Sequence, residues 1–321
     1  MRIVFMGTPA FAVPTLERLA KDGHELLVVT QPPRPAGRGL RPQPSAVRIA
    51  AAALGLEVSE RETLRGAEAI AGLVSFKPDL LVVACFGLIL GRTVLELPRL
   101  MPINLHPSLL PRHRGAAPIQ WTLLAGDLET GVTTMRMDKG IDTGDILLVE
   151  RTAVGPRENA IELAERLSRL GAEVMARTVE AAAAGTLAPR PQGEVGATYA
   201  PRLTKEDGHL DWRRPAVALE RQVRAVAGWP GARAQLGSEV VEIMRAEVVE
   251  TAVTRAAEDR PAPGIVATID ERGMEVGTGE GWLRLLELKP AGKGVMSPAA
   301  WARGRRVPVG VRWEMLPGAT A

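Results

Sequence analysis

The sequence predicts an α/β protein in which a Rossmann-like, mostly parallel open sheet is followed by a small OB-like β-barrel. Strand and helix patterns alternate through the first part of the chain, which is typical of a parallel sheet with helices on both faces. From residue 232 onward, short strand patterns separated by glycine turns replace them, as in a small barrel. The 321 residues are long for one compact domain and sufficient for two.

In the first part of the chain, apolar residues recur with the spacing of strands in some stretches and with the spacing of helices in others. Strands are expected at 2–5, 24–30, 80–84, 101–106, 130–137 and 146–150, and helices at 13–21, 45–54, 63–75, 119–125 and 157–184. The run 80–84 is continuously apolar, as buried parallel strands are. Gly7 is the single glycine of the first strand–helix turn, so the G-x-G-x-x-G fingerprint is missing and a nicotinamide cofactor is disfavoured.

Residues 31–44 form a long connection rich in proline, glycine and arginine. Structureless segments of this length inside compact domains are usually functional or disordered. The arginines suit a loop that becomes ordered on a phosphate backbone, and the alternative is a plain flexible insertion.

The chain changes character after its long helical pattern. Pro189, Pro191 and Pro201 indicate a connection between domains. We therefore expect a first domain at 1–189, a linker at 190–205 and a second domain at 206–321. The second domain has a helical pattern at 215–226 and strand patterns at 232–236, 240–249, 264–269, 273–276 and 282–288.

Basic residues cluster in two places although the net charge is only +3. No acid interrupts the stretch between Glu25 and Glu57, which holds four arginines. From Lys289 to the last residue there are six bases and one acid, Glu314. Such clusters favour a polyanionic partner such as nucleic acid, and the alternative is chance clustering in an arginine-rich sequence.

Cysteine and histidine usage limits the chemistry. The one cysteine, Cys85, lies in the apolar run 80–86, where we expect a strand core. A disulfide framework is therefore excluded, and a reducing cytoplasm is expected. The four histidines show no i,i+4 pairing, so a zinc site is not expected. The first residues lack the apolar region of a signal peptide, and no apolar run approaches the roughly 20 residues of a membrane-spanning helix.

Polar side chains alternate with apolar ones at 101–106. Read as a strand, Ile103 and Leu105 face one side while Asn104 and His106 share the other, roughly 6 to 7 Å apart along the backbone. Both can donate hydrogen bonds to one developing oxyanion, as acyl transfer requires. The alternative is a structural histidine beside a turn-forming asparagine.

A carboxylate near this pair would complete an acid–base site. Asp142 is our first choice because glycines on both sides let its loop close on a ligand, and Asp138 and Asp145 are close alternatives. No nucleophile is paired with the histidine, since Ser108 follows a proline and Cys85 is expected in a strand core. Direct attack by an incoming amine is therefore expected.

Three motifs resemble the formyltransferases that use 10-formyltetrahydrofolate: residues 86–90, 104–111 and 142–145. Residues 31–39, 112–120 and 290–293 narrow the resemblance to the methionyl-tRNA formyltransferases. The likeness covers nearly the whole chain. Phe86 stands where a tyrosine is common and Pro107 where a glycine is frequent, and neither departure affects the chemistry.

The resemblance implies a catalytic trio of Asn104, His106 and Asp142. Asn104 and His106 would hold the formyl oxygen as it becomes an oxyanion, and Asp142 would position or charge the imidazole and help relay the proton. The attacking amine would be the α-amino group of methionine on initiator tRNA, which yields formylmethionyl-tRNA for translation initiation. Folate would be the formyl-donor co-substrate, and no metal is expected.

The resemblance also assigns the two domains, as the formyltransferase catalytic domain and the tRNA-binding domain of an expected cytoplasmic monomer. The folate pocket would involve Phe86, Gly87, Leu88, Ile89, Leu90, Ser108, Leu109, Leu110, Pro111 and Asp142. The tRNA would meet Arg34, Arg38, Arg41, Lys205, Lys289, Lys293, Arg303, Arg305 and Arg306. Two rival functions are formyl transfer to a small amine such as a nucleotide or sugar, which leaves the residues after Lys205 without a task, and noncatalytic RNA binding.

Overall fold

A computed structural model describes residues 1–36, 41–249 and 262–316. The chain forms two compact units. The first comprises Met1–Pro118, Leu128–Val154 and Leu163–Ala200, and the second comprises Ile119–Asp127, Gly155–Glu162 and the chain from Pro201 onward. The expected linker at 190–205 stays a prediction, and its residues up to Ala200 belong to the first unit.

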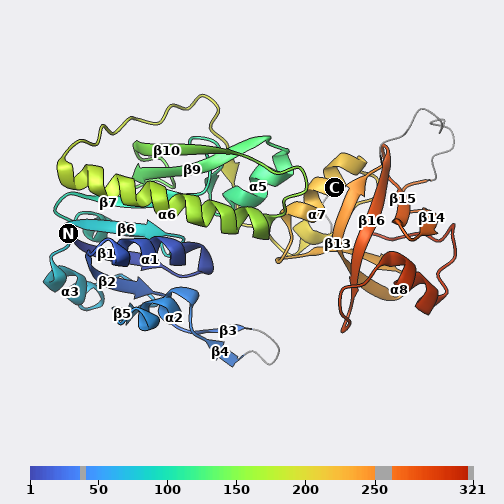
Figure 1. The fold of residues 1–321 in the computed structure, drawn as a ribbon, viewed down its shortest axis with the longest axis horizontal. Helices are drawn as coiled ribbons and strands as arrows, with labels where there is room; N and C mark the ends of the chain where they lie inside the picture. Colours follow the sequence, from blue (N-terminus) through green and yellow to red (C-terminus); the bar gives the residue numbers. More distant parts are fainter. Residues whose placement is uncertain (37–40, 250–261, 317–321) are drawn as a thin grey trace. The chain divides into compact units, whose positions relative to one another are not determined.

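A seven-stranded sheet forms the centre of the first unit (Figure 1). Its strands are β1 (Arg2–Gly7), β2 (Glu25–Thr30), β5 (Glu57–Glu60), β6 (Leu80–Ala84), β7 (Met101–His106), β9 (Glu129–Arg136) and β10 (Ile146–Ala153), in the order β10-β9-β7-β6-β1-β2-β5. The five strands from β5 to β7 are parallel, and β9 and β10 add antiparallel pairs at one edge. This confirms the predicted mostly parallel open sheet.

Helices cover both faces of the sheet. They are α1 (Val13–Lys21), α2 (Ala46–Ala53), α3 (Ala67–Phe76), α4 (Arg92–Leu95) and α6 (Ala160–Ala184), with a short 3-10 turn η1 (Ala10–Ala12) before α1. The side chain of Ser45 caps α2 by accepting from the Arg48 amide, as its place before an alanine-rich stretch predicts. Helices α1 and α6 lie in front of the sheet in Figure 1.

The alternation along the strands separates two apolar faces. Val4 of β1 and Val83 of β6 lie in a core that also contains Ile70 and Leu73 of α3. On the opposite face Leu105 of β7 lies so close to α6 that a Cβ on Gly171 would come within 2.7 Å of a Leu105 methyl carbon. Leu105 therefore packs in the core, as the period-two pattern predicts, and its neighbours Asn104 and His106 point the other way.

The connection at 31–44 differs from the expected structureless loop. Strands β3 (Arg34–Ala36) and β4 (Arg41–Gln43) pair antiparallel within the first unit (Figure 1). Strand β5 is also missed by the sequence pattern, because Glu57–Glu60 holds only one apolar residue at the sheet edge. Two further short strands, β8 (Arg114–Gly115) and β11 (Tyr199–Ala200), pair in parallel.

A five-stranded antiparallel sheet forms the second unit. Its elements are η2 (Glu206–Gly208), α7 (Ala216–Ala225), β12 (Ala232–Leu236), β13 (Glu239–Val248), β14 (Val266–Asp270), β15 (Gly273–Gly277), β16 (Trp282–Pro290) and α8 (Pro298–Arg305), with the strand order β12-β13-β16-β15-β14. Helix α5 (Pro118–Ala125) also belongs to this unit, apart from its first residue. All five predicted strands are present within two residues of the predicted ends. Helix α8 was not predicted.

The segment after α8 joins the two edges of this sheet. Glu314 exchanges backbone hydrogen bonds with Gln235 of β12 at 2.7 and 3.0 Å, while the amide of Trp313 donates to Gly264 O at 2.8 Å, next to β14. The Trp313 ring is 1% exposed and stacks on Trp301 of α8 with 5.5 Å between centroids. The two edges are thus bridged as in a small barrel, which agrees with the predicted fold class, whereas the predicted domain bounds stay a prediction.

Candidate active site

The polar pair lies at the carboxyl end of β7, where ligands bind in open α/β sheets. Asn104 Nδ2 donates to Asp142 Oδ1 at 3.3 Å, and His106 Nδ1 lies 3.6 Å from Asp142 Oδ2. Asp142 belongs to the turn between β9 and β10. The structure therefore brings the three expected side chains together around one carboxylate.

Backbone groups fix the orientation of this trio. His106 is 4% exposed, and its Nε2 lies 2.9 Å from His113 O. Since a carbonyl oxygen only accepts, Nε2 carries the hydrogen of this bond, and Nδ1 faces the carboxylate. The amide of Gly115 donates to Asp142 Oδ2 at 2.9 Å. A Cβ on Gly115 would approach Ala200 O to 2.7 Å, so this close approach requires glycine.

Left-handed backbone conformations gather at the site. Cys85, His113 and Asp142 have φ of 48°, 60° and 55°, values that non-glycine residues rarely adopt. Such outliers persist only where surrounding contacts hold them, and they cluster at functional sites. No sequence pattern predicts them, because none of these residues is a glycine.

The other two candidate carboxylates are engaged elsewhere. Asp138 accepts from the Gly140 amide at 2.9 Å and from the Thr143 hydroxyl at 2.8 Å, which closes its own turn. Asp145 forms an ion pair with Arg136. Among the three acids considered from the sequence, Asp142 is the one that faces His106.

Cys85 does not lie in a strand core, so that expectation is wrong. It follows the last residue of β6 and is exposed as a residue. Desolvation of the thiol by the surrounding protein and, to a smaller degree, the charge of the Asp142 carboxylate nevertheless together raise the pKa of Cys85 to about 12. The sulfur is thus near the trio but protonated at neutral pH, which disfavours covalent catalysis through this cysteine.

The segment Ser108–Pro111 is held by its own hydrogen bonds. Ser108 is fully buried, and its hydroxyl donates to Arg112 O at 2.7 Å. The Thr133 hydroxyl donates to Ser108 O at 2.7 Å, and the Leu110 amide donates to that hydroxyl at 3.3 Å. The serine side chain therefore shapes the loop. The part of Ser108, Leu109, Leu110 and Pro111 in ligand binding stays a prediction.

The loop Phe86–Leu90 after β6 is anchored through a backbone carbonyl. Phe86 O accepts from Gln31 Nε2 at 2.7 Å and from the Thr8 hydroxyl at 3.0 Å. The Phe86 and Leu90 side chains belong to the core below the loop, whereas Ile89 is 89% exposed. The loop can thus offer backbone groups and the side chains of Leu88 or Ile89 to a ligand. Its part in the expected folate pocket stays a prediction.

A cavity of ≈ 500 Å³ opens beside the trio in the first unit. It is lined by Arg92, Leu95, Glu96, Leu100, Met101, Pro102, Arg136, Met137, Asp138, Lys139 and Gly140. Pro102 precedes Asn104 by two residues on the same strand face, and residues 137–140 lead directly into the Asp142 turn. These lining residues were not predicted from the sequence, although the position of Pro102 on the Asn104 face is a usable signal.

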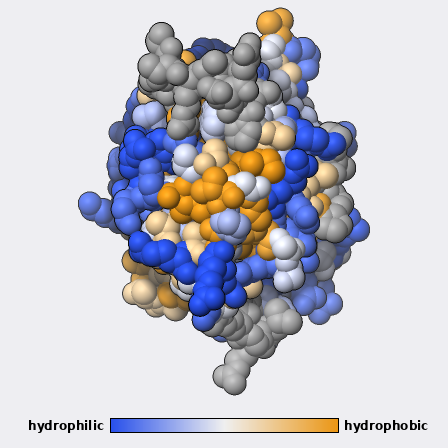
Figure 2. Space-filling view, turned by 90° about the vertical axis from the view of Figure 1, so that its right-hand side faces the viewer, coloured by the Kyte–Doolittle hydropathy of each residue, from blue (hydrophilic) through white to orange (hydrophobic). Residues whose placement is uncertain are grey.

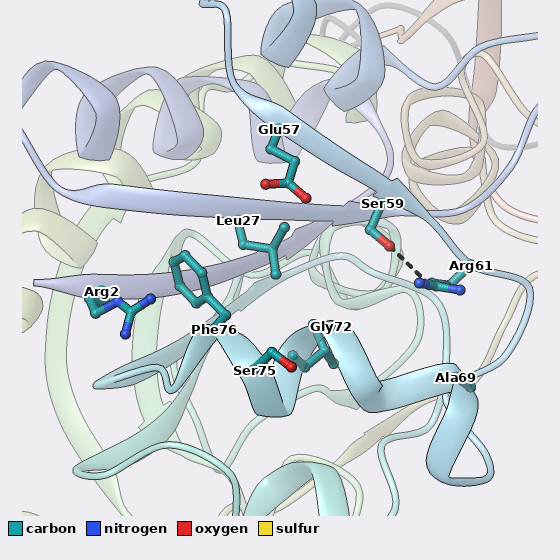
Figure 3. A pocket seen from close by; sticks show the side chains of 10 residues that line it. Arg2, Leu27, Glu57, Ser59, Arg61, Ala69, Gly72, Ser75 and Phe76 are labelled. Atoms are coloured by element: carbon teal, nitrogen blue, oxygen red, sulfur yellow. Dashed lines mark hydrogen bonds between the residues drawn. The ribbon is translucent and has the colours of Figure 1, made fainter.

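A second pocket of ≈ 370 Å³ lies along α3 and the edge strand β5 (Figure 3). Strands β6, β1 and β2 separate this edge from β7. The Arg2 guanidinium stacks on the Phe76 ring at 4.7 Å, and Arg61 Nε donates to the Ser59 hydroxyl at 2.9 Å. The pocket is therefore distant from the trio, and its cationic groups already have partners.

The expected tRNA-binding bases fall into different surroundings. Arg34 and Lys205 are exposed, Arg41 belongs to β4, and Arg38 lies outside the described residues. In the second unit three expected bases form surface ion pairs: Lys289 with Glu242, Arg303 with Glu271 and Arg305 with Glu239.

Lys293 and Arg306 are the two remaining bases of this set, and within the described ranges neither has an acid partner. Figure 2 shows an apolar area ringed by hydrophilic residues on the face at the right of Figure 1. That face is thus not uniformly charged, and the individual tRNA contacts stay predictions.

Metal ligation and membrane crossing find no support in the described residues. In the described part of the chain, no group of three or more histidine, cysteine, aspartate or glutamate side chains is placed to hold a metal ion. Over the same residues, no helix has both the length and the apolar character needed to cross a membrane.

Comparison with known proteins places the chain in a class. The sequence profile of the formyl transferase family matches residues 1–179, and that of the formyl transferase C-terminal domain matches residues 202–306. The chain is therefore a member of the formyl transferases.

Curated relatives narrow the class. The chain is 45% identical to the methionyl-tRNA formyltransferase of Solibacter usitatus, with 96% of each chain covered. It is 47% identical to that of Halorhodospira halophila, with 95% of this chain and 97% of the relative covered. The chain belongs to the methionyl-tRNA formyltransferase family.

Solved structures share the fold at low sequence identity. The sugar 3N-formyl transferase WlaRD, solved in the presence of dTDP and 5-N-formyl-THF, matches with a TM-score of 0.65 at 16% identity over 92% of this chain and 99% of that chain. HypX from Aquifex aeolicus in complex with tetrahydrofolic acid gives a TM-score of 0.65 at 17% identity, over 96% of this chain and 48% of that one. At these identities the matches support the fold alone.

Proposed function

We propose that this protein transfers the formyl group of 10-formyltetrahydrofolate to the α-amino group of methionine on initiator tRNA, with Asn104, His106 and Asp142 as catalytic residues. The observation that carries the proposal is the convergence of an amide donor and an imidazole on one carboxylate at the carboxyl end of β7. Membership of the family supplies the formyl donor and the acceptor.

Asn104 is suited to hold the oxyanion. Its side-chain nitrogen carries two hydrogens, of which one is directed to Asp142 Oδ1. The other has no acceptor among the residues that the structure describes, so it can donate to the formyl oxygen when the amine attacks the formyl carbon and the oxygen becomes negative. One such donor typically contributes a factor of about 10² to 10³ in kcat.

His106 is suited to move the proton. Its Nε2 hydrogen is committed to His113 O, so the neutral ring has no hydrogen left for the oxyanion role that the resemblance assigns to His106 beside Asn104. Nδ1 is instead the nitrogen that can accept a proton from the attacking amine. As a bond forms between the amine nitrogen and the formyl carbon, that proton passes to Nδ1. It is then delivered to N10 of the folate as the N10–carbon bond breaks, and tetrahydrofolate leaves uncharged at N10. Asp142 balances the positive imidazole between the two transfers.

The folate is a substrate, and the cavity beside the trio suits its ring system. The ≈ 500 Å³ volume and the apolar side chains of Leu95, Leu100 and Met101 match a flat heterocycle, and the charged lining residues can bond its polar edge. The Asp142 turn and the loop Phe86–Leu90 would then lie at the end of the ring that carries the formyl group.

We further propose that the protein acts as a monomer in the cytoplasm and that the second unit holds the tRNA. A five-stranded barrel is a common scaffold for nucleic-acid contact. Its exposed bases would bind phosphates, which position the acceptor end without reading sequence.

The test is a transfer assay with labelled 10-formyltetrahydrofolate and competing amines. We expect label on methionyl initiator tRNA and none on an amino-sugar nucleotide or on glycinamide ribonucleotide. If label appears only on a small amine, the proposed acceptor is wrong and the proposed formyl transfer stands. Binding of tRNA without any transfer would leave a noncatalytic RNA-binding protein.

A further inference from the structure

Residues 190–200, here called the strap, follow α6 and belong to the first unit, where Gln192 bonds to the main chain of Asp142. The strap begins with Arg190, which exchanges backbone hydrogen bonds with Ile146, the first residue of β10, at 2.8 and 2.9 Å. It ends in β11, which pairs with β8. Between these ends the strap has no helix or strand, so its side-chain contacts decide what it contributes.

Gln192 of the strap holds the turn that carries Asp142. Its Nε2 donates to Asp142 O at 2.9 Å and to Gly144 O at 2.6 Å. Its Oε1 accepts from Arg114 Nε at 3.1 Å. Both amide hydrogens and the amide oxygen are thus used, and this pattern fixes which end of the amide is nitrogen. The Gln192 side chain thus links the carbonyls of Asp142 and Gly144 to Arg114, which follows His113 in the chain.

The far part of the strap holds that same loop. The Thr198 hydroxyl accepts from the His113 amide at 2.8 Å, and Thr198 O accepts from the Arg114 amide at 2.9 Å. His113 O is the acceptor for His106 Nε2, and the Gly115 amide is a donor to Asp142. The strap therefore braces both groups that orient the trio.

We propose that Gln192 is a positioning residue for Asp142: by clamping the carbonyls of residues 142 and 144 it keeps the carboxylate within reach of Asn104 and His106. Gln192 touches no reacting atom. Loss of its two donors frees a turn whose left-handed Asp142 is unfavourable by itself, so the carboxylate can leave the geometry that proton transfer needs. The inference rests on the proposed formyl transfer.

The kinetic test compares Gln192→Ala with wild type at saturating tRNA. We expect kcat to fall by about 10- to 100-fold, the range that a small misplacement of a catalytic group produces, while KM for methionyl-tRNA and for the folate changes less than about threefold. Adding Gln192→Ala to Asp142→Asn should cause little further loss, because both changes remove the same function. Additive losses or a change confined to KM would overturn the role.

Gln222→Ala is the matched control. Gln222 of α7 makes the same kind of clamp, donating to Asp207 O at 2.8 Å and His209 O at 3.0 Å, but in the second unit. Both variants should lower the melting temperature, whereas only Gln192→Ala should lower kcat with labelled formyl donor. An equal fall of kcat in both variants would mean that Gln192 only stabilises the fold and does not position Asp142.

A readout without catalysis separates this inference from the proposed function. The Gly115 amide donates to Asp142 Oδ2, so its hydrogen exchange reports where the carboxylate lies. Gln192→Ala should speed that exchange at least about tenfold, and Gln222→Ala should not. Unchanged exchange at Gly115 would refute the clamp even in an active enzyme. If the Gly115 amide exchanges faster in Gln192→Ala but the wild-type protein transfers no formyl group, the clamp is supported and the proposed reaction is wrong.

Discussion

At the scale of single residues, the site depends on which hydrogens are already engaged. The Nε2 hydrogen of His106 and one Asn104 amide hydrogen have partners inside the protein, so the remaining amide hydrogen and the imidazole Nδ1 are available to a substrate. In the proposed mechanism the trio offers one hydrogen-bond donor and one proton carrier, which is the minimum for direct formyl transfer to an amine.

Cys85 gives a residue-scale prediction that depends on pH. Because its pKa is raised to about 12, the thiolate fraction at pH 8 is small, and a thiol reagent should react at least about tenfold more slowly with the folded protein than with the unfolded chain. The rate should rise continuously as the pH is increased above 8, since thiolate forms only as the pH approaches the pKa.

Stopped-flow labelling of the folded protein and of the chain in guanidinium measures this difference directly, because Cys85 is the one cysteine of the sequence. Asp142→Asn should increase the folded-state rate, as the carboxylate contributes to the raised pKa. A folded-state rate equal to that of the unfolded chain would contradict the account.

The residues of the trio could be predicted from the sequence, but their supports could not. Period-two alternation places Asn104 and His106 on one face, and glycines flank Asp142. The support from His113 uses a backbone carbonyl, which every residue type has, and the support from Gln192 comes from a proline-rich segment 50 residues away from Asp142 in the chain. Neither leaves a local pattern.

At the scale of elements, hydrogen bonds between Arg2 and Asp79 help to fix the parallel sheet. They lie at the amino ends of β1 and β6, whereas the trio lies at the carboxyl end of β7. The Arg2 amide at the start of β1 donates to Asp79 Oδ2 at 3.0 Å, and the Asp79 amide before β6 donates to Arg2 O at 2.8 Å. Arg99 Nε donates to the other Asp79 oxygen at 2.9 Å. These bonds support the register in which Ile3 lies beside Leu80.

Asp79→Asn tests this link. The hydrogen bond from the Arg2 amide, together with the Arg99 guanidinium, holds the pKa of Asp79 below its usual range. The depressed pKa means that the carboxylate stabilises the fold above its unfolded-state pKa of about 3.9 and that this contribution is lost as the pH falls through the lower folded-state pKa. Denaturant titration at pH 7 should show a loss of about 1 kcal/mol, the usual net value of a hydrogen bond.

The difference between Asp79→Asn and wild type should shrink as the pH falls from about 4 through the lowered folded-state pKa of Asp79, because the unfolded chain takes up the proton first and the folded wild type then loses the same charge. Asp270→Asn is the control, since Asp270 bonds within its own turn to Arg272 and should affect unfolding less. A constant difference at every pH would argue against the carboxylate as the source of stability.

Elements with strong apolar patterns were predicted well, and those without them were not. The strand at Leu80–Ala84 and the helix Val13–Lys21 match their predicted ends. Strand β5 lies at an edge and is largely polar, while α8 is an eight-residue helix that contains Gly304. Both take their conformation from tertiary contacts that no local pattern records.

At the scale of the whole molecule, the chain combines two parts that each match a family profile. Residues 1–179, which carry the trio, match the formyl transferase family, and residues 202–306, which include the barrel, match its C-terminal domain. The barrel could be predicted from its glycine-separated strands, but the segment that bridges its edges could not. Residues 310–314 have little strand pattern, and they are held by Trp313 and by backbone bonds to both edges.

The charges of the barrel give a prediction for tRNA use. Replacing Lys293 and Arg306 together by alanine should raise KM for methionyl-tRNA several-fold and lessen its salt dependence by about one unit of log–log slope for each phosphate that the variant no longer binds. KM for the folate should not change. Kinetics between about 50 and 200 mM salt measure the slope, with Arg245→Ala/Arg272→Ala as the control pair because both arginines have acid partners and neither is among the expected tRNA contacts. Equal slopes in wild type and in the Lys293/Arg306 variant would remove these two residues from the interface.

The central claim is that the trio performs formyl transfer to methionyl-tRNA. The most direct test is the single-turnover rate of formylmethionyl-tRNA formation by His106→Ala beside wild type, with both substrates saturating. The account predicts a fall of at least about 100-fold with tRNA binding retained, since the proton carrier is lost while the second unit is intact. A His106→Ala enzyme that forms formylmethionyl-tRNA at the wild-type rate would contradict it.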